Sequence, residues 1–206
     1  MAVRIDRPTQ AERRARSRTA LVEAAARGLS RHGYARLNLE QVAREAGYTR
    51  GALYHQFADK QALAMAVIQW VDEAWREEVG PLIDRESDPV DALLAMARGH
   101  AIFCRRDVAR VVMALRVEFS GQIHPVGREI ERISESGIKR VARLIKAGRR
   151  DESIPPGPPA ATVAAAFVGA LEGAVIALAG RAPYDELLAV RTAAGVLGLT
   201  APGVAR

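Results

Sequence analysis

Residues 38–57 hold two short segments with helical spacing of apolar side chains, separated by a glycine, and this run constrains the fold more than any other part of the chain. Asn38 is suited to cap the first segment, because its side-chain oxygen can accept hydrogen bonds from the unpaired N–H groups of a helix start. Gly47 ends that helix, and Thr49 caps a second helix that runs to about Phe57. The run predicts a helix, a tight turn and a second helix.

The same reading extends to the residues on either side. Apolar residues at Leu21, Val22, Ala25 and Leu29 form one face of an earlier helix, which Gly33 ends. The first helix of the 38–57 run is expected over residues 39–46, with Gln41 completing a capping box with Asn38. The two helices of this run are expected to pack onto the earlier helix through five apolar residues: Val42, Ala43, Ala46, Leu53 and Phe57.

Most of the remaining chain also reads as helix. Asp59 caps a long fourth helix with an apolar stripe that includes Leu63, Val67, Trp70 and Val71, and Gly80-Pro81 is expected to end it. The clearest loop spans residues 153–159, which contain four prolines. No segment alternates at period two, so the fold class is all-α with about nine helices. The later helices are predicted over residues 89–105, 107–122, 125–149, 159–180 and 184–198.

Positive charge is concentrated at the start of the chain. Residues 1–60 contain 12 basic and six acidic residues, whereas the rest contain 18 of each. A basic module on a neutral body is typical of a protein that binds a polyanion, although a solvated charged face would have the same composition. The basic stretch expected before the first helix is a candidate for phosphate or minor-groove contacts, and a disordered arm is the alternative for residues 1–10. Its arginines are Arg13, Arg14, Arg16 and Arg18.

The composition argues against several other classes. The single cysteine, Cys104, excludes an internal disulfide and is expected to be a small buried hydrophobe. The four histidines form no metal-ligand cluster, and no phosphate-binding glycine loop or nucleophile elbow is present. Glu118 and His124 form only a loose pair. We therefore expect no metal, no cofactor and no catalytic residues, and a protein that is not an enzyme.

No apolar segment typical of a signal peptide follows Met1. Residues 160–180 are long enough to cross a bilayer, but they are mostly Ala and Gly and carry Glu172 near the centre. A charged residue there disfavours insertion, so a buried interface helix is preferred to a membrane span. We expect a cytoplasmic protein that does not bind a membrane.

Several short groups of residues occur together in a fixed order between Arg18 and Leu63. This combination resembles the DNA-binding head of the TetR family of transcriptional regulators, and it covers about a quarter of the chain. One departure is Asn38-Leu39, where the family often has two threonines. The groups are Ala24-Ala25, His32-Gly33-Tyr34, Leu39-Glu40-Gln41-Val42-Ala43, Ala46-Gly47-Tyr48-Thr49, Gly51-Ala52-Leu53-Tyr54-His55-Gln56-Phe57 and Asp59-Lys60-Gln61-Ala62-Leu63.

The resemblance implies a domain of residues 1–60 that binds double-stranded DNA and a helical body of residues 61–206 for effector binding and dimerisation. Arg50 is the best candidate for reading a base, because a guanidinium can pair with two atoms of guanine. Thr49 can donate its hydroxyl to a phosphate, and Lys60 can place a point charge near one. The expected DNA-binding residues are Arg44, Thr49, Arg50, Gly51, Ala52, Tyr54, His55 and Lys60.

These residues also have simpler interpretations. Gly51 and Ala52 would allow close approach to base edges, and Tyr54 and His55 would contact the DNA backbone. Tyr54 could instead be a half-buried packing residue, and His55 could be a solvated surface side chain. Arg44 could be an ordinary helix charge.

Ala165, Gly169, Gly173 and Ala177 recur every four residues along one face of the 160–180 segment. Such small residues let two helices approach closely. With the last helix they predict a four-helix interface in a homodimer, as the resemblance implies, and two DNA-binding heads would then meet major grooves about 34 Å apart. Packing of the same stripe within one subunit is the alternative. The apolar residues of the last helix are Leu187, Leu188, Val190, Val196 and Leu197.

The resemblance also implies a small-molecule pocket among the middle helices, whose occupation would change the spacing of the two heads. Each candidate could equally be an ordinary core or surface residue, and the ligand is not identified by the sequence. The candidates are polar or aromatic residues on otherwise apolar helices: Trp70, His100, Phe103, Cys104, Arg116, Glu118, Phe119, His124 and Glu172.

The preferred interpretation is a sequence-specific transcriptional regulator that acts as a repressor and leaves a near-palindromic operator when it binds a small molecule. A transcriptional activator and a non-specific architectural DNA binder stay open as alternatives. The neutral body of about 145 residues argues against the architectural class, whose charge is usually spread over the surface.

Overall fold

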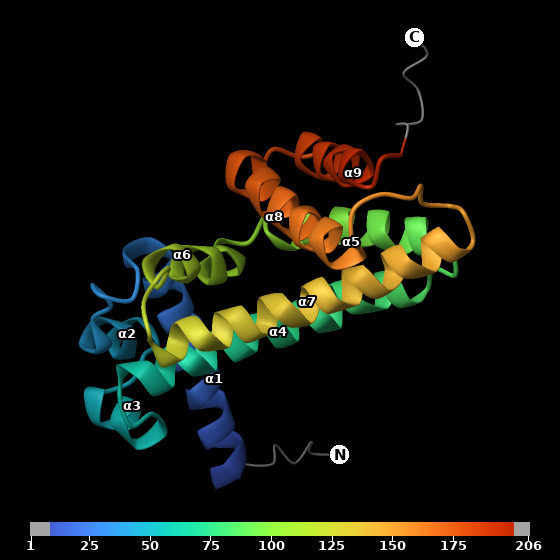
Figure 1. The fold of residues 1–206 in the computed structure, drawn as a ribbon. Coiled ribbons are helices and arrows are strands. Elements are labelled where there is room, and N and C mark those ends of the chain that lie inside the picture. Colours follow the sequence, from blue (N-terminus) through green and yellow to red (C-terminus); the bar gives the residue numbers. More distant parts are fainter. Residues whose placement is uncertain (1–8, 200–206) are drawn as a thin grey trace, which may run out of the picture.

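The computed structural model describes residues 9–199, and in that range all the regular structure is helical (Figure 1). The predicted all-α class with about nine helices is confirmed. The helices are α1 (Gln10–His32), α2 (Leu39–Glu45), α3 (Arg50–Gln56), α4 (Lys60–Asp84), α5 (Pro89–Phe103), the 3-10 helix η1 (Asp107–Arg110), α6 (Val111–Glu118), α7 (Pro125–Arg150), α8 (Ala160–Leu178) and α9 (Tyr184–Val196).

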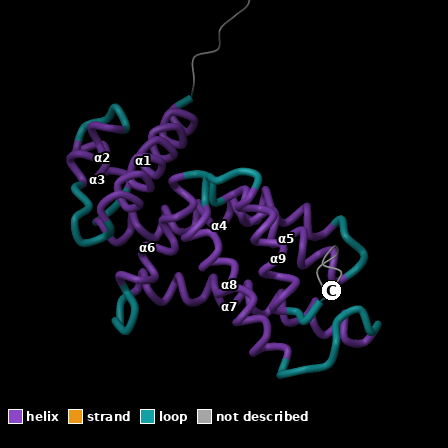
Figure 2. Tube along the Cα trace, turned by 90° about the horizontal axis from the view of Figure 1, so that it is seen from above, coloured by secondary structure: helices purple, strands orange, loops and turns teal. Residues whose placement is uncertain are grey.

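Helices α1, α2 and α3 gather at one end of the molecule, and we call them the head (Figures 1 and 2). Val42 and Ala43 of α2 and Leu53 of α3 are buried, as is Phe57 just after α3. Gly47 joins α2 to α3 with a φ of 78°, a conformation that glycine adopts without a side-chain clash. The predicted helix–turn–helix is therefore present, and its apolar residues pack onto α1.

The caps of α2 and α3 follow the prediction in part. The side-chain oxygen of Asn38 accepts hydrogen bonds from the N–H groups of Glu40 and Gln41, at 2.9 and 3.1 Å. The predicted capping box is wrong, because the Gln41 amide donates to Glu45 one turn later, at 2.8 Å. The helix start needs no second cap, because Asn38 alone occupies two of its free donors.

Helix α1 begins earlier than the sequence pattern suggested. Thr9 caps it in a capping box with Glu12, so Arg13, Arg14 and the two arginines after them lie on its first turns. The expectation that these arginines precede the first helix is wrong. The polar first half of α1 has no apolar stripe to reveal it, and its only local signal is the Thr9–Glu12 capping box. Of the expected arm, residues 1–8 lie outside the described residues.

Helix α4 also differs from the prediction, because it continues through Gly80-Pro81 to Asp84. A proline normally disfavours helix for the residue before it, since the proline ring clashes with that residue's Cβ. Gly80 has no Cβ, so this clash is absent. Val79 and Ile83 are both buried, and their burial favours one more turn.

The body forms around α4 and α7, which pack along each other (Figure 1). Helices α8 and α9 pack together, and α5 contacts α4, α7 and α9. The core at this end includes Phe167, Leu171 and Ile145. Arg105 after α5 donates hydrogen bonds to both oxygens of Asp185 on α9, at 2.9 and 2.8 Å. The loop predicted over residues 153–159 lies between α7 and α8.

Candidate functional site

The N-terminal turn of α3 faces solvent. Thr49 caps the helix by accepting a hydrogen bond from the Ala52 N–H at 3.2 Å, and a hydroxyl in this position can still donate its proton. Arg50 and Gly51 are exposed beside it. On the opposite side of α3, Leu53 is completely buried, which fixes the orientation of the helix.

Four of the other predicted DNA-binding residues are distributed around this turn. Tyr54 is 43% exposed and lies one turn after Arg50, whose guanidinium carbon is 5.5 Å from the centre of the Tyr54 ring. His55 and Arg44 are exposed, and Ala52 is half-buried. The α3 residues form a continuous polar surface on a short, well-packed helix.

Lys60, the first residue of α4, makes an internal contact beside its predicted role near a phosphate. Its ammonium group donates a hydrogen bond to the carbonyl of Ala35, at 3.1 Å, and lies 4.6 Å from the centre of the Tyr34 ring. The side chain therefore fixes the start of α4 against the loop between α1 and α2. A DNA phosphate at Lys60 would either replace the contact with the Ala35 carbonyl or bind the ammonium group in addition to it.

Tyr34 lies where the head meets the body. The Glu118 carboxylate, at the end of α6, accepts hydrogen bonds from the N–H groups of Tyr34 and Ala35, at 2.6 and 2.7 Å. The Tyr34 ring makes edge contacts with Phe119 and His124, whose rings stack on each other at 4.4 Å. Burial, followed by the nearby carboxylates of Asp59 and Glu118, raises the pKa of Tyr34. We call Tyr34, Lys60, Glu118, Phe119 and His124 the Tyr34 junction.

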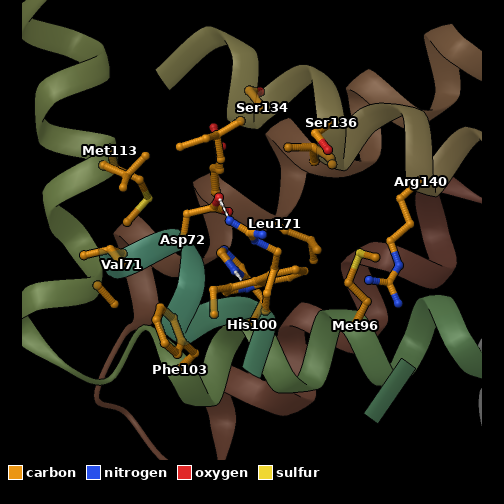
Figure 3. Close-up of a pocket in the computed structure, with 18 of the residues that line it drawn as sticks. Val71, Asp72, Met96, His100, Phe103, Met113, Ser134, Ser136, Arg140 and Leu171 are labelled. Carbon is orange, nitrogen blue, oxygen red and sulfur yellow. Dashed lines mark hydrogen bonds and ion pairs between the residues drawn. The ribbon is translucent and has the colours of Figure 1, made fainter. Parts of the chain in front are cut away.

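The body contains a cavity of about 390 Å³ that is partly open to solvent and is lined by α4, α5, α6, α7 and α8. A volume of this size suits a small organic molecule. Apolar side chains line one part of it, among them Val71, Met96 and Phe103. Figure 3 shows Ser134 and Ser136 along α7, across the cavity from His100 and Phe103.

His100 is a neutral polar group in the apolar part of this cavity. Its Nδ1 accepts a hydrogen bond from the indole N–H of Trp75 at 3.1 Å, which leaves the proton of the neutral ring on Nε2. Burial lowers the pKa of His100 to about 4. Burial also raises the pKa of the neighbouring Cys104 thiol to about 12, so the thiol is not a reactive thiolate near neutral pH.

The cavity lining is strongly basic elsewhere. It includes five arginines, two of which pair with carboxylates that also line the cavity. Arg116 donates to Glu172 at 2.5 Å, and Arg76 donates to Asp72 at 2.6 Å. The other three arginines, all on α7, are Arg132, Arg140 and Arg143.

The cavity contains five of the nine residues predicted as pocket candidates: His100, Phe103, Cys104, Arg116 and Glu172. Glu118, Phe119 and His124 lie at the Tyr34 junction, because α6 ends there and its last residues turn toward the head. Trp70 packs half-buried against the hydrophobic core.

The residues that sequence reasoning missed are mostly on α7. Arg132, Ser136, Arg140 and Arg143 are spaced by four, four and three residues, so they lie on one face of that helix. This spacing is visible in the sequence, but a polar stripe on an amphipathic helix usually faces solvent. Only the packing of α7 across the body turns it toward a cavity.

The small-residue stripe of α8 lies on the outside of the subunit. Ala165, Gly169, Gly173 and Ala177 are all exposed, and a Cβ added at either glycine would meet no atom within 4 Å. Ile176 beside them is 69% exposed. Packing of the stripe within one subunit, the alternative interpretation, does not occur. By length and composition alone, α8 is also the one described helix that could cross a membrane.

Helix α9 has a mixed surface next to α8. Leu187 is exposed, Leu197 is buried, and the other three apolar residues predicted for the interface are half-buried: Leu188, Val190 and Val196. Exposed apolar residues are thus present both on α8 and in the first turn of α9, which carries Tyr184 and Leu187.

The sequence of this chain is similar to those of known bacterial regulators. The family model for bacterial regulatory proteins of the tetR family matches residues 21–67. The A-factor receptor protein of Streptomyces griseus is 30% identical over 157 residues, which are 72% of this chain and 51% of that protein. The chain thus spans about half the length of this relative.

Solved structures show the same fold. A TetR transcriptional regulator from Chloroflexus aurantiacus superposes with a TM-score of 0.76 at 18% identity, over 90% of this chain and 94% of that one. AibR, solved in complex with isovaleryl coenzyme A and operator DNA, superposes with a TM-score of 0.71 at 19% identity, over 89% of this chain and all of that one. The family model thus identifies residues 21–67 as the head of a bacterial regulatory protein of the tetR family, and the described chain as a whole has the fold of the solved TetR regulators.

Proposed function

We propose that this protein is a homodimeric transcriptional repressor that binds a near-palindromic operator through α3 and leaves it when a small molecule occupies the body cavity. The observation that carries the proposal is the N-terminal turn of α3, where Thr49, Arg50 and Gly51 are exposed above a buried Leu53. A short helix held in this way can place its exposed turn in a major groove. The basic charge of residues 1–60 supports contact with the phosphate backbone.

Dimerisation is supported by the exposed stripe of α8. An apolar surface of small residues on the outside of a subunit favours burial against an identical surface, because a two-fold interface uses the same patch on both partners. Two heads joined in this way would read two half-sites. We assign residues 1–60 to operator binding and residues 61–206 to dimerisation and effector binding.

Release by a small molecule is supported by the cavity and by two similar proteins. AibR has been solved in complex with isovaleryl coenzyme A and operator DNA. The relative from Streptomyces griseus is a receptor protein by its name. Helix α4 lines the cavity with Val71 and Trp75 and begins at Lys60, beside the head. A ligand that favours one position of α4 would therefore change the position of the head.

The first test is titration of the purified protein onto the DNA upstream of its own gene, with random DNA as competitor and a fixed salt concentration. We expect binding that survives the competitor and a footprint with two-fold symmetry. Binding that the competitor removes, on this DNA and on sites selected from random sequence, would contradict sequence-specific regulation. Expression of a reporter behind the operator then distinguishes repression from activation.

The dimer has a separate test. Replacing Gly173 with Arg places a long charged side chain on the exposed stripe without an internal clash, since nothing lies within 4 Å of an added Cβ. We expect sedimentation to change from dimer to monomer and operator binding to weaken. Replacing exposed Arg150, at the far end of α7, with Glu is the control. An unchanged dimer in the Gly173→Arg variant would place the interface elsewhere.

A further inference from the structure

We propose that the effector of this protein is an anionic amphiphile, with an apolar chain in the inner part of the cavity and a carboxylate or phosphate bound by arginines of α7. The inference rests on the proposed function, in which the cavity is the effector site. It adds the chemical class of the ligand, which follows from the distribution of apolar and charged groups in the lining.

The inner part of the cavity suits an apolar chain. Val71, Met96, Phe103 and Leu171 are buried core residues that also line the cavity. The polar group among them, His100, is neutral near pH 7 because burial lowers its pKa to about 4. This region therefore offers van der Waals contact and no charge to a ligand.

The α7 side offers positive charge. Arg143 lines the cavity on its open side, where its side chain is exposed, and no hydrogen bond or ion pair is found for it within the described part of the chain. Its neighbour on the same face, Arg140, donates to Asp84 at 2.6 Å, but the Asp84 side chain is 74% exposed. An ion pair this open to water holds its partner weakly, so an anion in the cavity can recruit Arg140 as well.

Hydroxyl groups complete the anion site. Ser134, half-buried, and Ser136, exposed, line the cavity, and no hydrogen bond is found for either hydroxyl within residues 9–106 and 109–199. Hydroxyl and guanidinium groups are all donors to carboxylate and phosphate oxygens. A cationic ligand would find two carboxylates in a lining that holds five arginines, and both carboxylates, Asp72 and Glu172, pair with arginines of that lining.

Gly137 offers a position at which the cavity can be blocked. It lines the cavity on α7, and a Cβ added there would meet no atom within 4 Å. A larger side chain at this position would occupy the cavity without displacing the protein. The position thus allows a variant that blocks the site and keeps the fold.

The test uses four probes that share one ten-carbon chain: decanoate, decyl phosphate, decanol and decyltrimethylammonium. Calorimetric titration of the full-length protein without DNA gives the dissociation constant of each. We expect the better anion to bind at least about tenfold more tightly than decanol, and the cation to bind most weakly. The two anions distinguish a carboxylate from a phosphate ligand. Equal binding of decanol and both anions, a preference for the cation, or no binding by any probe would overturn the proposal.

Two variants locate the site. Arg143→Gln should weaken the binding of the better anion about tenfold, which corresponds to about 1.4 kcal/mol, and leave the affinity for decanol unchanged. Lys146→Gln, on the same helix and exposed outside the cavity, is the matched control. Gly137→Leu should abolish binding of the anion and of decanol while the unfolding temperature is retained. Parental anion affinity in either cavity variant would overturn the assignment.

Because these titrations contain no DNA, failure of operator binding does not affect their outcome. An anion that binds with the expected selectivity but does not release the protein from an established operator would retain the ligand class and contradict the proposed regulation. The two proposals can therefore fail separately.

Discussion

The carboxylate of Glu118 lies 2.6 Å from the main-chain nitrogen of Tyr34, 84 residues away in sequence. A second oxygen of the same carboxylate accepts the N–H of Ala35. Gly33 immediately before them has a φ of 72°, and a Cβ there would lie 2.7 Å from the carboxylate. The end of α6 is thus held on the turn after α1 by two charge-assisted hydrogen bonds.

We predict that Glu118→Ala lowers the free energy of unfolding by about 1–3 kcal/mol, because two main-chain donors lose their acceptor in a partly buried place. Urea unfolding followed by circular dichroism measures the change. Glu135→Ala is the control, since Glu135 forms only an exposed pair with Lys139. Equal stability of the two variants would mean that water replaces the carboxylate at no cost.

The head gives a prediction that separates base reading from backbone contact. Arg50→Ala should reduce the preference for operator over random DNA by about 1–3 kcal/mol, because it removes a side chain that can pair with guanine. Lys60→Ala should weaken binding to both DNAs and reduce the salt dependence. Competition titrations at several salt concentrations measure both effects.

Lys60→Ala should also lower the unfolding temperature, since Lys60 bonds to the Ala35 carbonyl. Arg50→Ala should not, because Arg50 is exposed. Retained operator preference in Arg50→Ala would assign base reading to another residue of α3.

His100 predicts a dependence of stability on pH. Because its folded pKa is about 4 and its ordinary value is 6.5, the unfolded chain binds more protons between these values. Stability should therefore rise with pH from about 4 to about 6.5 and stay level with respect to this group above that range. Urea unfolding of the parent and of His100→Gln across this range measures it, and the difference between the two proteins should change with pH. A constant difference would contradict the prediction.

Two neighbouring arginines allow a comparison of a buried and an exposed ion pair. Arg105 pairs with Asp185, whose side chain is 2% exposed, whereas Arg106 pairs with Glu78 at the surface. Arg105→Ala should cost about 3 kcal/mol, because it leaves a buried carboxylate without its guanidinium. Arg106→Ala should cost less than about 1 kcal/mol. Thermal and urea unfolding of both variants test this order, and equal losses would contradict it.

The Arg105–Asp185 pair affects the stability of the fold at a lower pH than His100 does. The hydrogen bonds from Arg105 hold the pKa of Asp185 below its ordinary value of 3.8. The stability that this carboxylate supplies is present above about pH 4 and is lost as the pH falls through the lower, folded pKa. The stability difference between the parent and Asp185→Asn should therefore shrink only in acid below about pH 4.

Local signals account for the parts of the fold that the sequence predicted well. Asn38, Gly47 and Thr49 act within a few residues of themselves, so the helix–turn–helix could be predicted from their order alone. Gly80-Pro81 was misjudged, because the usual effect of proline was offset by a missing Cβ and by burial of Val79 and Ile83. Burial of that kind depends on helices far away in sequence.

The candidate site was predicted less completely for the same reason. Five of the nine pocket candidates line the cavity, and they could be selected because polar or aromatic groups on apolar helices stand out. Glu118 was assigned to the wrong place, since its partners on the α1–α2 turn are distant in sequence. Arg143 was not identified, because nothing in the spacing along α7 distinguishes a polar face that meets solvent from one that lines a cavity.

The cavity of about 390 Å³ has a thermodynamic consequence for the whole protein. Apolar side chains that line an open cavity are exposed to water there, and a ligand that covers them removes apolar surface from water and so favours the folded state. A ligand that binds only the folded state adds about 2.7 kcal/mol at a hundred times its dissociation constant. In a chain of this length that raises the unfolding temperature by roughly 5–10 °C. The melting curve of the protein is therefore itself a detector of the natural ligand, and a metabolite extract can be fractionated by it before any operator is known.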